Sequence, residues 1–253
     1  MRTDLLDAVV NEVNGYHMRP VLQYDYDNVR SRLIFEALSQ GVQYVCNNAV
    51  EGDIAEFGTS SGFSSFTIAR AMAIYQRTYA RQLAQQGLAQ RKALHLFDSF
   101  QGLPKPDNPV DLASPYVKSG RWQQGTFGGP AALTQQELKA LCASTYDQDR
   151  IFVFPGWFSQ SLAGVAAQAR FAMLHIDCDL YSSTAEVLEH VLAHGHVAEG
   201  CVVFFDDWNC NRSSPRMGQR RAWHEAVERH RIEFSDCGDY AVLGHKFIIH
   251  GPG

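Results

Sequence analysis

Two acidic clusters stand at the ends of short apolar runs, and they carry the clearest chemistry in this chain. Residues 177–179 read Asp-Cys-Asp after the apolar run 171–176, and residues 206–207 read Asp-Asp after the run 201–205. Such runs are typical of buried parallel strands, whose carboxyl ends bind ligands. Adjacent carboxylates repel each other unless water or a cation compensates them, and carboxylate oxygens suit a hard divalent ion such as Mg²⁺. The two clusters together favour a metal site over the alternative of solvated loop acids or helix caps.

A small-residue loop lies upstream of these clusters. Residues 53–62 read DIAEFGTSSG, which predicts a strand, an acid and a turn, and a helix is predicted from Phe63 to about Arg81. Glycines in such a turn allow tight turning and close approach to a ligand, and the N–H groups at the helix start favour an anionic group. Ser60 replaces the middle glycine of the dinucleotide fingerprint, and no Gly-Lys-Ser/Thr follows, so the loop matches neither that fingerprint nor a P-loop.

The next apolar run, residues 93–97, ends at Asp98. An acid at the end of the second strand of a doubly wound sheet is placed to accept hydrogen bonds from ribose hydroxyls. The order of loop, helix, strand and acid therefore predicts a nucleoside-type cofactor bound across the carboxyl edge of the sheet, with a metal beside it.

Five motifs in the chain resemble those of the macrocin O-methyltransferase family. They are AEFGTSSGFSS, LFDSFQGLP, PGWFSQSL, HIDCDLYSST and FFDDWN, and the resemblance runs from about Val29 to the end. The family comprises class I S-adenosylmethionine-dependent enzymes, several of which methylate sugar hydroxyls of antibiotics. The resemblance therefore implies an S-adenosylmethionine- and Mg²⁺-dependent O-methyltransferase whose acceptor is a hydroxylated small molecule such as a sugar.

The resemblance also implies roles for individual residues. The first loop would border the methionine part of the cofactor, Asp98 would hold its ribose, and Gly156 with Trp157 would flank its adenine. The implied metal ligands are Asp177, Asp206 and Asp207. The full set of cofactor contacts that we expect is Glu56, Phe57, Gly58, Thr59, Ser60, Gly62, Ser64, Asp98, Ser99, Gly156, Trp157 and Asp177.

Methyl transfer to an oxygen requires that the acceptor hydroxyl be held in line with the methyl group and lose its proton. Asp177 and Asp179 are two residues apart, so on an extended strand both would face one side. We expect Asp177 to be a metal ligand and Asp179 the catalytic base or an orienting group, although the two roles are interchangeable at this stage. Two rival functions are a nucleotide-sugar or nicotinamide oxidoreductase and a non-catalytic scaffold with the cofactor fold.

Composition restricts the class of protein. The chain has 253 residues, a net charge of −5 and no basic stripe, so we expect no nucleic-acid partner. No apolar run approaches the roughly 20 residues that span a bilayer, and the first residues lack the apolar core of a signal peptide. None of the six cysteines forms a C-x-x-C pair, which is typical of reduced thiols. We therefore expect a cytoplasmic protein without membrane contact.

Strands and helices alternate along the sequence, which predicts an α/β fold with a mostly parallel sheet and helices on both faces. The family resemblance adds the doubly wound, seven-stranded, Rossmann-like architecture of class I methyltransferases. We expect residues 1–50 to form an N-terminal helical extension and residues 51–253 to form the methyltransferase domain. Within that domain the Pro- and Gly-rich segment 101–144 is predicted to be a lid-like insertion. Apolar positions in residues 1–47 exceed what the sheet covers, so we expect a homo-oligomer.

Four local patterns give further expectations. Thr134 and Glu137 predict a capping box for a helix that ends near residue 143. A helix is expected over 158–169, and another over 182–194 with Ser182 or Ser183 as its N-cap. Residues 232–234 and 246–250 are expected to form two antiparallel strands.

Overall fold

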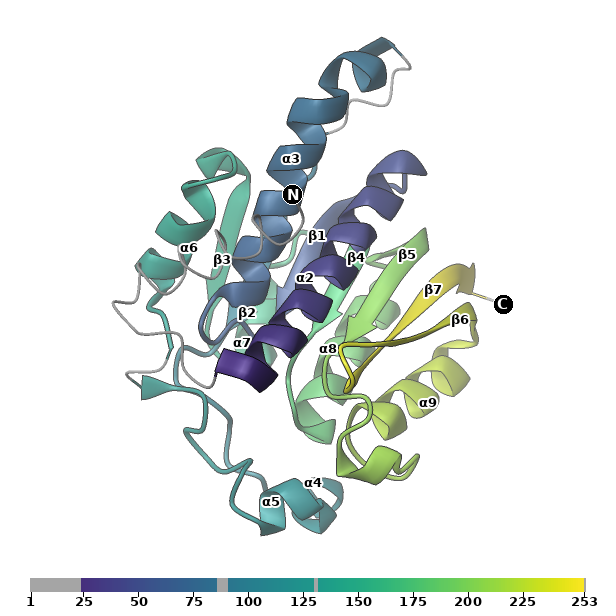
Figure 1. The fold of residues 1–253 in the computed structure, drawn as a ribbon. Helices are drawn as coiled ribbons and strands as arrows, with labels where there is room; N and C mark the ends of the chain where they lie inside the picture. Colours follow the sequence, from purple (N-terminus) through teal and green to yellow (C-terminus); the bar gives the residue numbers. More distant parts are fainter. Residues whose placement is uncertain (1–23, 86–90, 130–131, 253) are drawn as a thin grey trace.

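Seven strands form one sheet at the centre of the molecule, in the order β3-β2-β1-β4-β5-β7-β6 (Figure 1). The computed structural model describes residues 24–85, 91–129 and 132–252. The first five strands run parallel, and β7 is antiparallel between β5 and β6. This confirms the α/β fold and the antiparallel terminal pair. The strands are β1 (Asp53–Phe57), β2 (Leu94–Asp98), β3 (Ile151–Pro155), β4 (Phe171–Ile176), β5 (Val197–Phe205), β6 (Ile232–Tyr240) and β7 (Gly244–Pro252).

Strand register brings the predicted site residues to one edge. Phe57 at the end of β1 pairs with Phe97 of β2 and with Ile176 of β4, and Ile176 pairs with Phe205 of β5. The residues that follow these positions therefore emerge side by side. The order of the strands reverses between β1 and β4, which is the switch point where open parallel sheets bind ligands.

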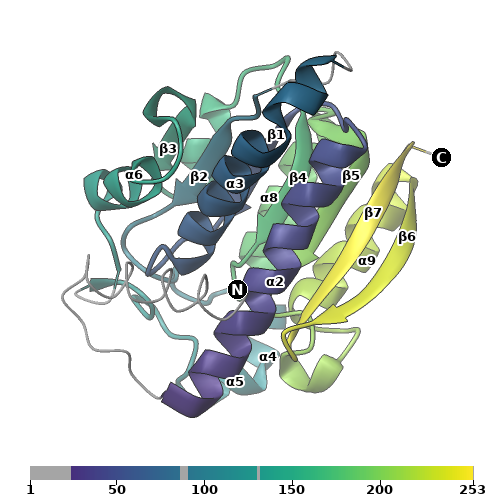
Figure 2. The ribbon, with the colours of Figure 1, turned by 45° about the horizontal axis from the view of Figure 1, so that its top comes forward.

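Helices cover both faces of the sheet (Figure 2). On one face α2 (Tyr24–Asn47), α3 (Phe63–Gln85) and α6 (Gln135–Ala143) contribute to one apolar core. On the other face α8 (Tyr181–Ala193) and α9 (Gly218–His230) contribute to a second core, which includes the fully buried Trp223. The short elements are α4 (Pro109–Ala113), α5 (Pro115–Lys118), α7 (Phe158–Ser161) and the 3-10 helices η2 (Gln148–Arg150), η3 (Leu162–Gly164) and η4 (Asn211–Ser213).

The helix expected over 158–169 is wrong in its length. Helix α7 ends at Ser161, the single turn η3 follows, and Val165 is already extended, with φ −72° and ψ 125°. Glycine lowers helix propensity by about 1 kcal/mol relative to alanine, and Gly164 stands at the end of this turn. The extended backbone lets Val165 pack against the apolar core below α8.

The cap predicted for α8 is also wrong. Leu180 occupies the N-cap position and makes no side-chain cap bond. Instead the carboxylate of Asp111, from α4 of the insertion, accepts hydrogen bonds from the backbone N–H groups of Tyr181 (2.8 Å) and Ser182 (3.2 Å). A residue about 70 positions away therefore does what a local serine was expected to do. By contrast, the capping box of Thr134 and Glu137 on α6 is confirmed.

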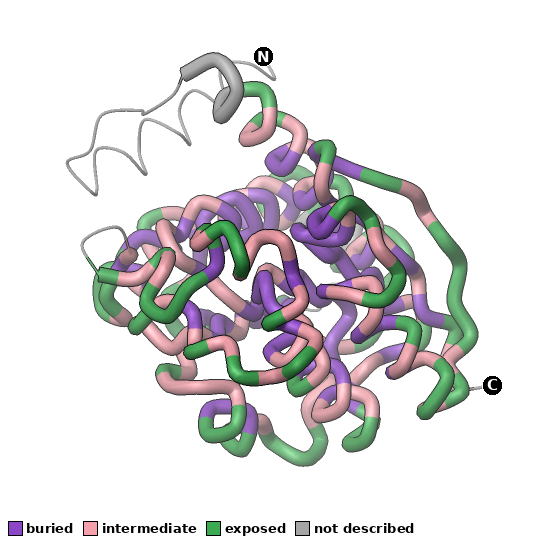
Figure 3. The backbone as a smooth tube through the Cα atoms, turned by 90° about the horizontal axis from the view of Figure 1, so that it is seen from below, coloured by how far each residue is buried: buried purple, intermediate pink, exposed green. Residues whose placement is uncertain are grey.

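The N-terminal prediction is tested in part. Of the helical extension predicted over residues 1–50, residues 1–23 lie outside the described residues, and α2 (Tyr24–Asn47) is a helix as expected. All six cysteines carry free thiols. Within the described residues no helix combines the length and apolar character needed to cross a bilayer. Figure 3 shows the burial along the backbone, viewed from below. The domain limits and the homo-oligomer stay predictions.

Candidate functional site

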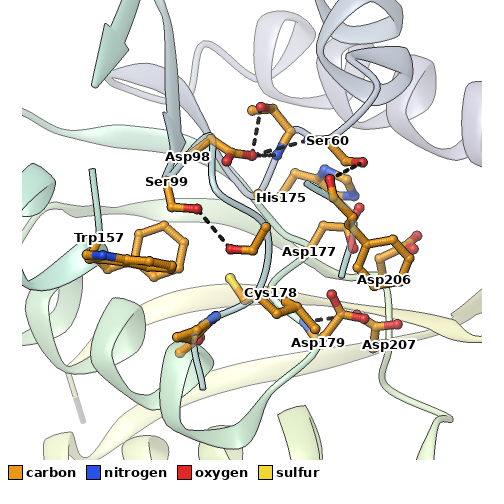
Figure 4. Close-up of a pocket in the computed structure, with 18 of the residues that line it drawn as sticks. Ser60, Asp98, Ser99, Trp157, His175, Asp177, Cys178, Asp179, Asp206 and Asp207 are labelled. Atoms are coloured by element: carbon orange, nitrogen blue, oxygen red, sulfur yellow. Dashed lines mark hydrogen bonds between the residues drawn. The ribbon is translucent and has the colours of Figure 1, made fainter. Parts of the chain in front are cut away.

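A cavity of about 680 Å³ opens at the carboxyl edge of the sheet, at the switch point (Figure 4). Its size lies within the range of about 300–1,000 Å³ that is usual for small-molecule sites. Most of the predicted cofactor contacts line it, and the predicted metal ligands line it as well. The predicted residues on its wall are Gly58, Thr59, Ser60, Ser64, Asp98, Ser99, Gly156, Trp157, Asp177, Asp179, Asp206 and Asp207.

Asp98 organises the first loop from the end of β2. Its Oδ2 accepts hydrogen bonds from the backbone N–H of Thr59 (2.6 Å), from the Thr59 hydroxyl (2.9 Å) and from the backbone N–H of Ser60 (3.2 Å). Its Oδ1 accepts one from the backbone N–H of Phe100 (2.7 Å). A carboxylate offers about four acceptor positions over its two oxygens. The second position of Oδ1 is therefore the one suited to a ribose hydroxyl.

The two loop glycines are required first by the protein itself. Gly58 has φ +90°, and a Cβ there would lie 2.0 Å from the carbonyl oxygen of Asp177. Gly62 has φ +77°, and its Cβ would meet Leu133 at 2.6 Å. Both spaces are filled by neighbouring chain segments. These glycines are therefore required mainly by the packing of the protein itself, and not, as the sequence suggested, by the close approach of a ligand. A substitution at Gly58 would also disturb the join between β1 and β4.

Glu56 lies beneath the cavity rather than on its wall. It is fully buried, accepts a hydrogen bond from the hydroxyl of Ser65, and lies 2.9 Å from His175 Nδ1. Burial alone would lower the pKa of His175, but the hydrogen bond and negative charge of Glu56 raise it to about 9. The pair is thus a buried ion pair that joins β1 to β4. Phe57 is also buried, and its ring stacks on that of Phe97 with centroids 4.9 Å apart.

The three predicted metal ligands come together. Carboxylate oxygens of Asp177, Asp206 and Asp207 all lie within 4.8 Å of one another. Burial raises the pKa of Asp177 well above its usual value, and the charges of the other two aspartates raise it further. Burial, with the charge of Asp206, raises the pKa of Asp207 to about 7. Three converging carboxylates, among which Asp177 and Asp207 have raised pKa values, indicate a place that a cation would stabilise.

Sequence reasoning missed the cation that faces this cluster. The guanidinium of Arg30, from α2, forms an ion pair with Asp206, and its side chain is 31% exposed while that of Asp206 is 5% exposed. Burial alone would lower the pKa of Arg30, but Asp206, Asp177 and Asp207 raise it above its usual value. Arg30 lies one helical turn before Ile34, which also lines the cavity, and the local sequence gives no signal that either residue faces it.

Asp179 reaches the cavity by a different route from the one expected. Strand β4 ends at Ile176, and Asp179 has φ +59°, so the alternation of an extended strand does not apply to it. Aspartate is among the few non-glycine residues that adopt this left-handed conformation readily. Its backbone N–H donates to Asp207 Oδ2 at 3.2 Å, and its side chain is buried at the cavity wall outside the three-carboxylate cluster.

The insertion contributes one side of the cavity. Leu103, Lys105 and Phe127 line it. Tyr116 and Trp122 instead stack on each other, with ring centroids 4.6 Å apart, and Trp122 is buried. These two aromatic residues therefore anchor the insertion, and Phe127 is the one that faces the cavity. Lid motion stays a prediction.

Sequence comparison places the whole site within one family. Residues 29–234 match the family described as macrocin O-methyltransferase (TylF). The chain belongs to the macrocin O-methyltransferase family. Every predicted site residue falls within the matched range.

Two curated relatives and one solved structure are similar to this chain. The chain is 28% identical over 169 residues to an 8-demethyl-8-(2,3-dimethoxy-alpha-L-rhamnosyl)-tetracenomycin-C 4'-O-methyltransferase of Streptomyces olivaceus, covering 66% of this chain and 57% of that protein. It is 26% identical over 215 residues to a mycinamicin III 3''-O-methyltransferase of Micromonospora griseorubida, covering 82% of this chain and 74% of that one. The chain thus spans little more than half the length of the first relative. The solved O-methyltransferase NovP shares the fold, with a TM-score of 0.67 at 21% identity over 98% of this chain and 99% of that one.

Proposed function

We propose that this chain is an S-adenosylmethionine-dependent O-methyltransferase that methylates a sugar hydroxyl of a natural product, with a divalent cation at its acidic cluster. The observation that carries the proposal is the layout of the cavity. One end holds Asp98 and Trp157, and the other end holds Asp177 and Asp206 (Figure 4). A nucleoside cofactor and a metal-bound acceptor would thus lie side by side.

The cofactor end fits S-adenosylmethionine. Asp98 Oδ1 retains an acceptor position for a ribose hydroxyl. Gly156 has φ +120°, and the indole of Trp157 lies next to it at the cavity wall, where a flat adenine ring would have an aromatic partner. The hydroxyl of Ser64 and the backbone of the first loop, near the start of α3, would face the methionine carboxylate.

The acidic end fits a hard divalent cation. Asp206 Oδ1 is buried and has no hydrogen-bond partner among the described residues, and two further carboxylates lie within 4.8 Å. Oxygen-only donors suit Mg²⁺, Mn²⁺ or Ca²⁺. When bound by Asp177, Asp206 and Asp207, the ion would stabilise the negative charge that develops on the acceptor oxygen.

The chain's own residues would position the acceptor and the cofactor and accept the proton of the hydroxyl. The fixed cluster and the first loop hold acceptor and cofactor at neighbouring positions, which is the positioning that methyl transfer requires. Asp179 lines the same cavity beside Asp207 and is placed to accept the acceptor's proton on a carboxylate oxygen. Phe127 and Leu103 of the insertion cover one side and exclude water from it.

The curated relatives support the acceptor class. Both are named as O-methyltransferases, the first of a rhamnosyl-bearing tetracenomycin and the second of mycinamicin III, and they are 26–28% identical to this chain. Vicinal hydroxyls of a sugar offer two oxygens to one cation, so a sugar suits the acidic end.

Methyl transfer to a panel of rhamnosyl and related glycosides, followed by mass spectrometry, tests the proposal. We expect S-adenosylmethionine and Mg²⁺ together to give a product 14 mass units heavier, and chelator to abolish it. Asp206→Asn is expected to lose most activity while S-adenosylmethionine affinity measured by calorimetry changes little. Asp149→Asn, an exposed acid on η2, is the matched control. Binding of NADH in place of S-adenosylmethionine, or full activity of Asp206→Asn in chelator, would contradict the proposal.

A further inference from the structure

Three histidines gather where α8 ends and β5 begins. A ring nitrogen of each of His190, His194 and His196 lies within 4.8 Å of the others. The ring centroids are 4.4 Å apart for His190 and His194, and 5.5 Å apart for His190 and His196. His196 directly precedes β5, whose far end leads to Asp206. The cluster therefore lies at the opposite edge of the sheet from the cavity.

The backbone holds this cluster in place. His190 and His194 are four residues apart, so they share one face of the last turn of α8. Gly195 has φ +62°, its N–H donates to the carbonyl of Leu192 (3.1 Å), and the N–H of His196 donates to the carbonyl of Val191 (2.8 Å). These two bonds form a Schellman motif, which folds the chain back over the helix end. His196 is thereby returned to the side of the other two histidines.

Hydrogen bonds orient two of the three rings. Nδ1 of His194 lies 2.9 Å from the carbonyl oxygen of His190, and Nδ1 of His196 lies 3.0 Å from the carbonyl oxygen of Ala169. Because a carbonyl oxygen only accepts, each Nδ1 must carry the proton, and in the neutral ring Nε2 keeps its lone pair. Metal-binding histidines in proteins are oriented by such bonds to carbonyl groups.

The third ring offers an unused nitrogen. Nε2 of His190 is buried and has no hydrogen-bond partner within the described part of the chain. His194 is exposed and His196 is 2% exposed, so the cluster opens to solvent on one side only. Burying an imidazole nitrogen without a hydrogen-bond partner costs free energy of folding, unless a ligand binds that nitrogen.

We propose that His190, His194 and His196 bind a transition-metal ion of the Zn²⁺ type. Three imidazole nitrogens with a fourth position open to water suit Zn²⁺, Co²⁺, Ni²⁺ or Cu²⁺ rather than Mg²⁺. Tetrahedral Zn²⁺ with bonds of about 2.0–2.1 Å places its nitrogen ligands roughly 3.4 Å apart. The three ring nitrogens lie within 4.8 Å of one another, so binding would require them to move closer together.

The ion would join the end of α8 to the residue that precedes β5. His196 also accepts, through its carbonyl, a hydrogen bond from the N–H of Phe171 (2.6 Å), which begins β4. Fixing His196 to α8 therefore fixes the point where β4 and β5 enter the sheet. The expected consequence is greater stability, and it does not depend on the proposed methyltransferase activity.

Titration of the full chain, purified without a histidine tag, with Co²⁺ in the presence of excess Mg²⁺ tests the proposal. We expect visible absorption bands of cobalt held by nitrogen ligands in tetrahedral geometry. His194→Gln changes an exposed side chain and is expected to weaken binding by an order of magnitude or more. His190→Gln is expected to do the same. His224→Gln, another exposed histidine, is the matched control and is expected to bind Co²⁺ as the natural chain does.

Thermal denaturation gives an independent readout. Zn²⁺ is expected to raise the Tm of the natural chain and of His224→Gln, and to leave that of His194→Gln unchanged, because only bound ligand stabilises the folded state. Asp206→Asn is expected to keep both the cobalt spectrum and the Zn²⁺ effect, which separates this site from the acidic cluster. A cobalt spectrum that is absent, or that survives in both histidine variants, would overturn the proposal. So would loss of the spectrum in Asp206→Asn.

Discussion

Arg30→Met is the substitution that tests the electrostatics of the acidic cluster most directly. The guanidinium of Arg30 pairs with Asp206, close to Asp177 and Asp207, and methionine retains an unbranched apolar stem while removing the guanidinium and its charge. Opposite unit charges about 4 Å apart attract by about 4 kcal/mol at an effective dielectric constant of 20. Exposed pairs contribute about 0–1 kcal/mol, and breaking a buried pair costs about 3–5 kcal/mol.

The Arg30 pair lies between these limits, because its guanidinium side is 31% exposed and its carboxylate side 5% exposed. We therefore expect Arg30→Met to lose about 1–3 kcal/mol of stability in the presence of chelator. For a domain of this length 1 kcal/mol shifts Tm by about 2–4 °C, so the expected drop is roughly 2–12 °C. The loss arises because Asp206 then loses the guanidinium that it contacts.

Magnesium is expected to reverse most of this loss. A divalent ion at the cluster supplies the missing charge, so Mg²⁺ is expected to raise the Tm of Arg30→Met more than that of the natural chain. Calorimetry is expected to show about tenfold tighter Mg²⁺ binding, since the ion no longer competes with the guanidinium. Arg32→Met, which removes an exposed arginine from the same helix, is the control. An unchanged Tm in chelator, or equal stabilisation of both chains by Mg²⁺, would refute the reasoning.

Three further predictions follow from the structure. Asp111→Ala leaves two backbone N–H groups of α8 without their acceptor, so urea denaturation is expected to show that the free energy of unfolding falls by about 2–3 kcal/mol. The control Asp149→Ala is expected to change little. A fall below about 0.5 kcal/mol in Asp111→Ala would show that water replaces the cap. Asp98→Ala removes the acceptor that holds the first loop and the predicted ribose contact, so the free energy of S-adenosylmethionine binding, measured by calorimetry, is expected to weaken by about 1–3 kcal/mol. An unchanged affinity would show that Asp98 does not bind the cofactor. Burial alone would raise the pKa of Asp53, but hydrogen bonds from His95 and Ala93 lower it. Its stabilising effect is therefore present above the unfolded pKa near 3.9 and is lost as pH falls through the lower folded value. The stability difference between the natural chain and Asp53→Asn is expected to shrink in acid unfolding series below about pH 4, and a constant difference would contradict this assignment.

The sequence allowed most of the sheet edge to be predicted. Apolar runs that end in Asp98, Asp177 and Asp206 mark strands, because buried parallel strands read as continuous apolar runs and their ends reach solvent abruptly. The convergence of these residues follows from parallel strands sharing one edge. Local signals at helix ends were reliable where both partners are close in sequence, as in the capping box of Thr134 and Glu137.

Contacts between distant segments could not be read from local pattern. Asp111 caps α8 across 70 residues of chain, and Arg30 reaches Asp206 across 176 residues. Neither side chain differs in type or spacing from an ordinary surface residue of its own helix. Their roles exist only because α4 and α2 pack against the carboxyl edge.

What the sequence by itself determined was the kind of site: a small-residue loop, an acid at the end of the second strand and two acidic clusters at the ends of later strands. Such features depend on the steric properties and the apolar pattern of residues within a few positions of one another, so they can be read from the sequence. Tertiary structure alone decided how the buried charges are balanced. It placed Glu56 against His175 beneath the cavity, Arg30 against the acidic cluster, and the Asp179 carboxylate at the wall through a left-handed turn. Burial removes water from these groups, and the partners that replace the water come from segments far apart in sequence.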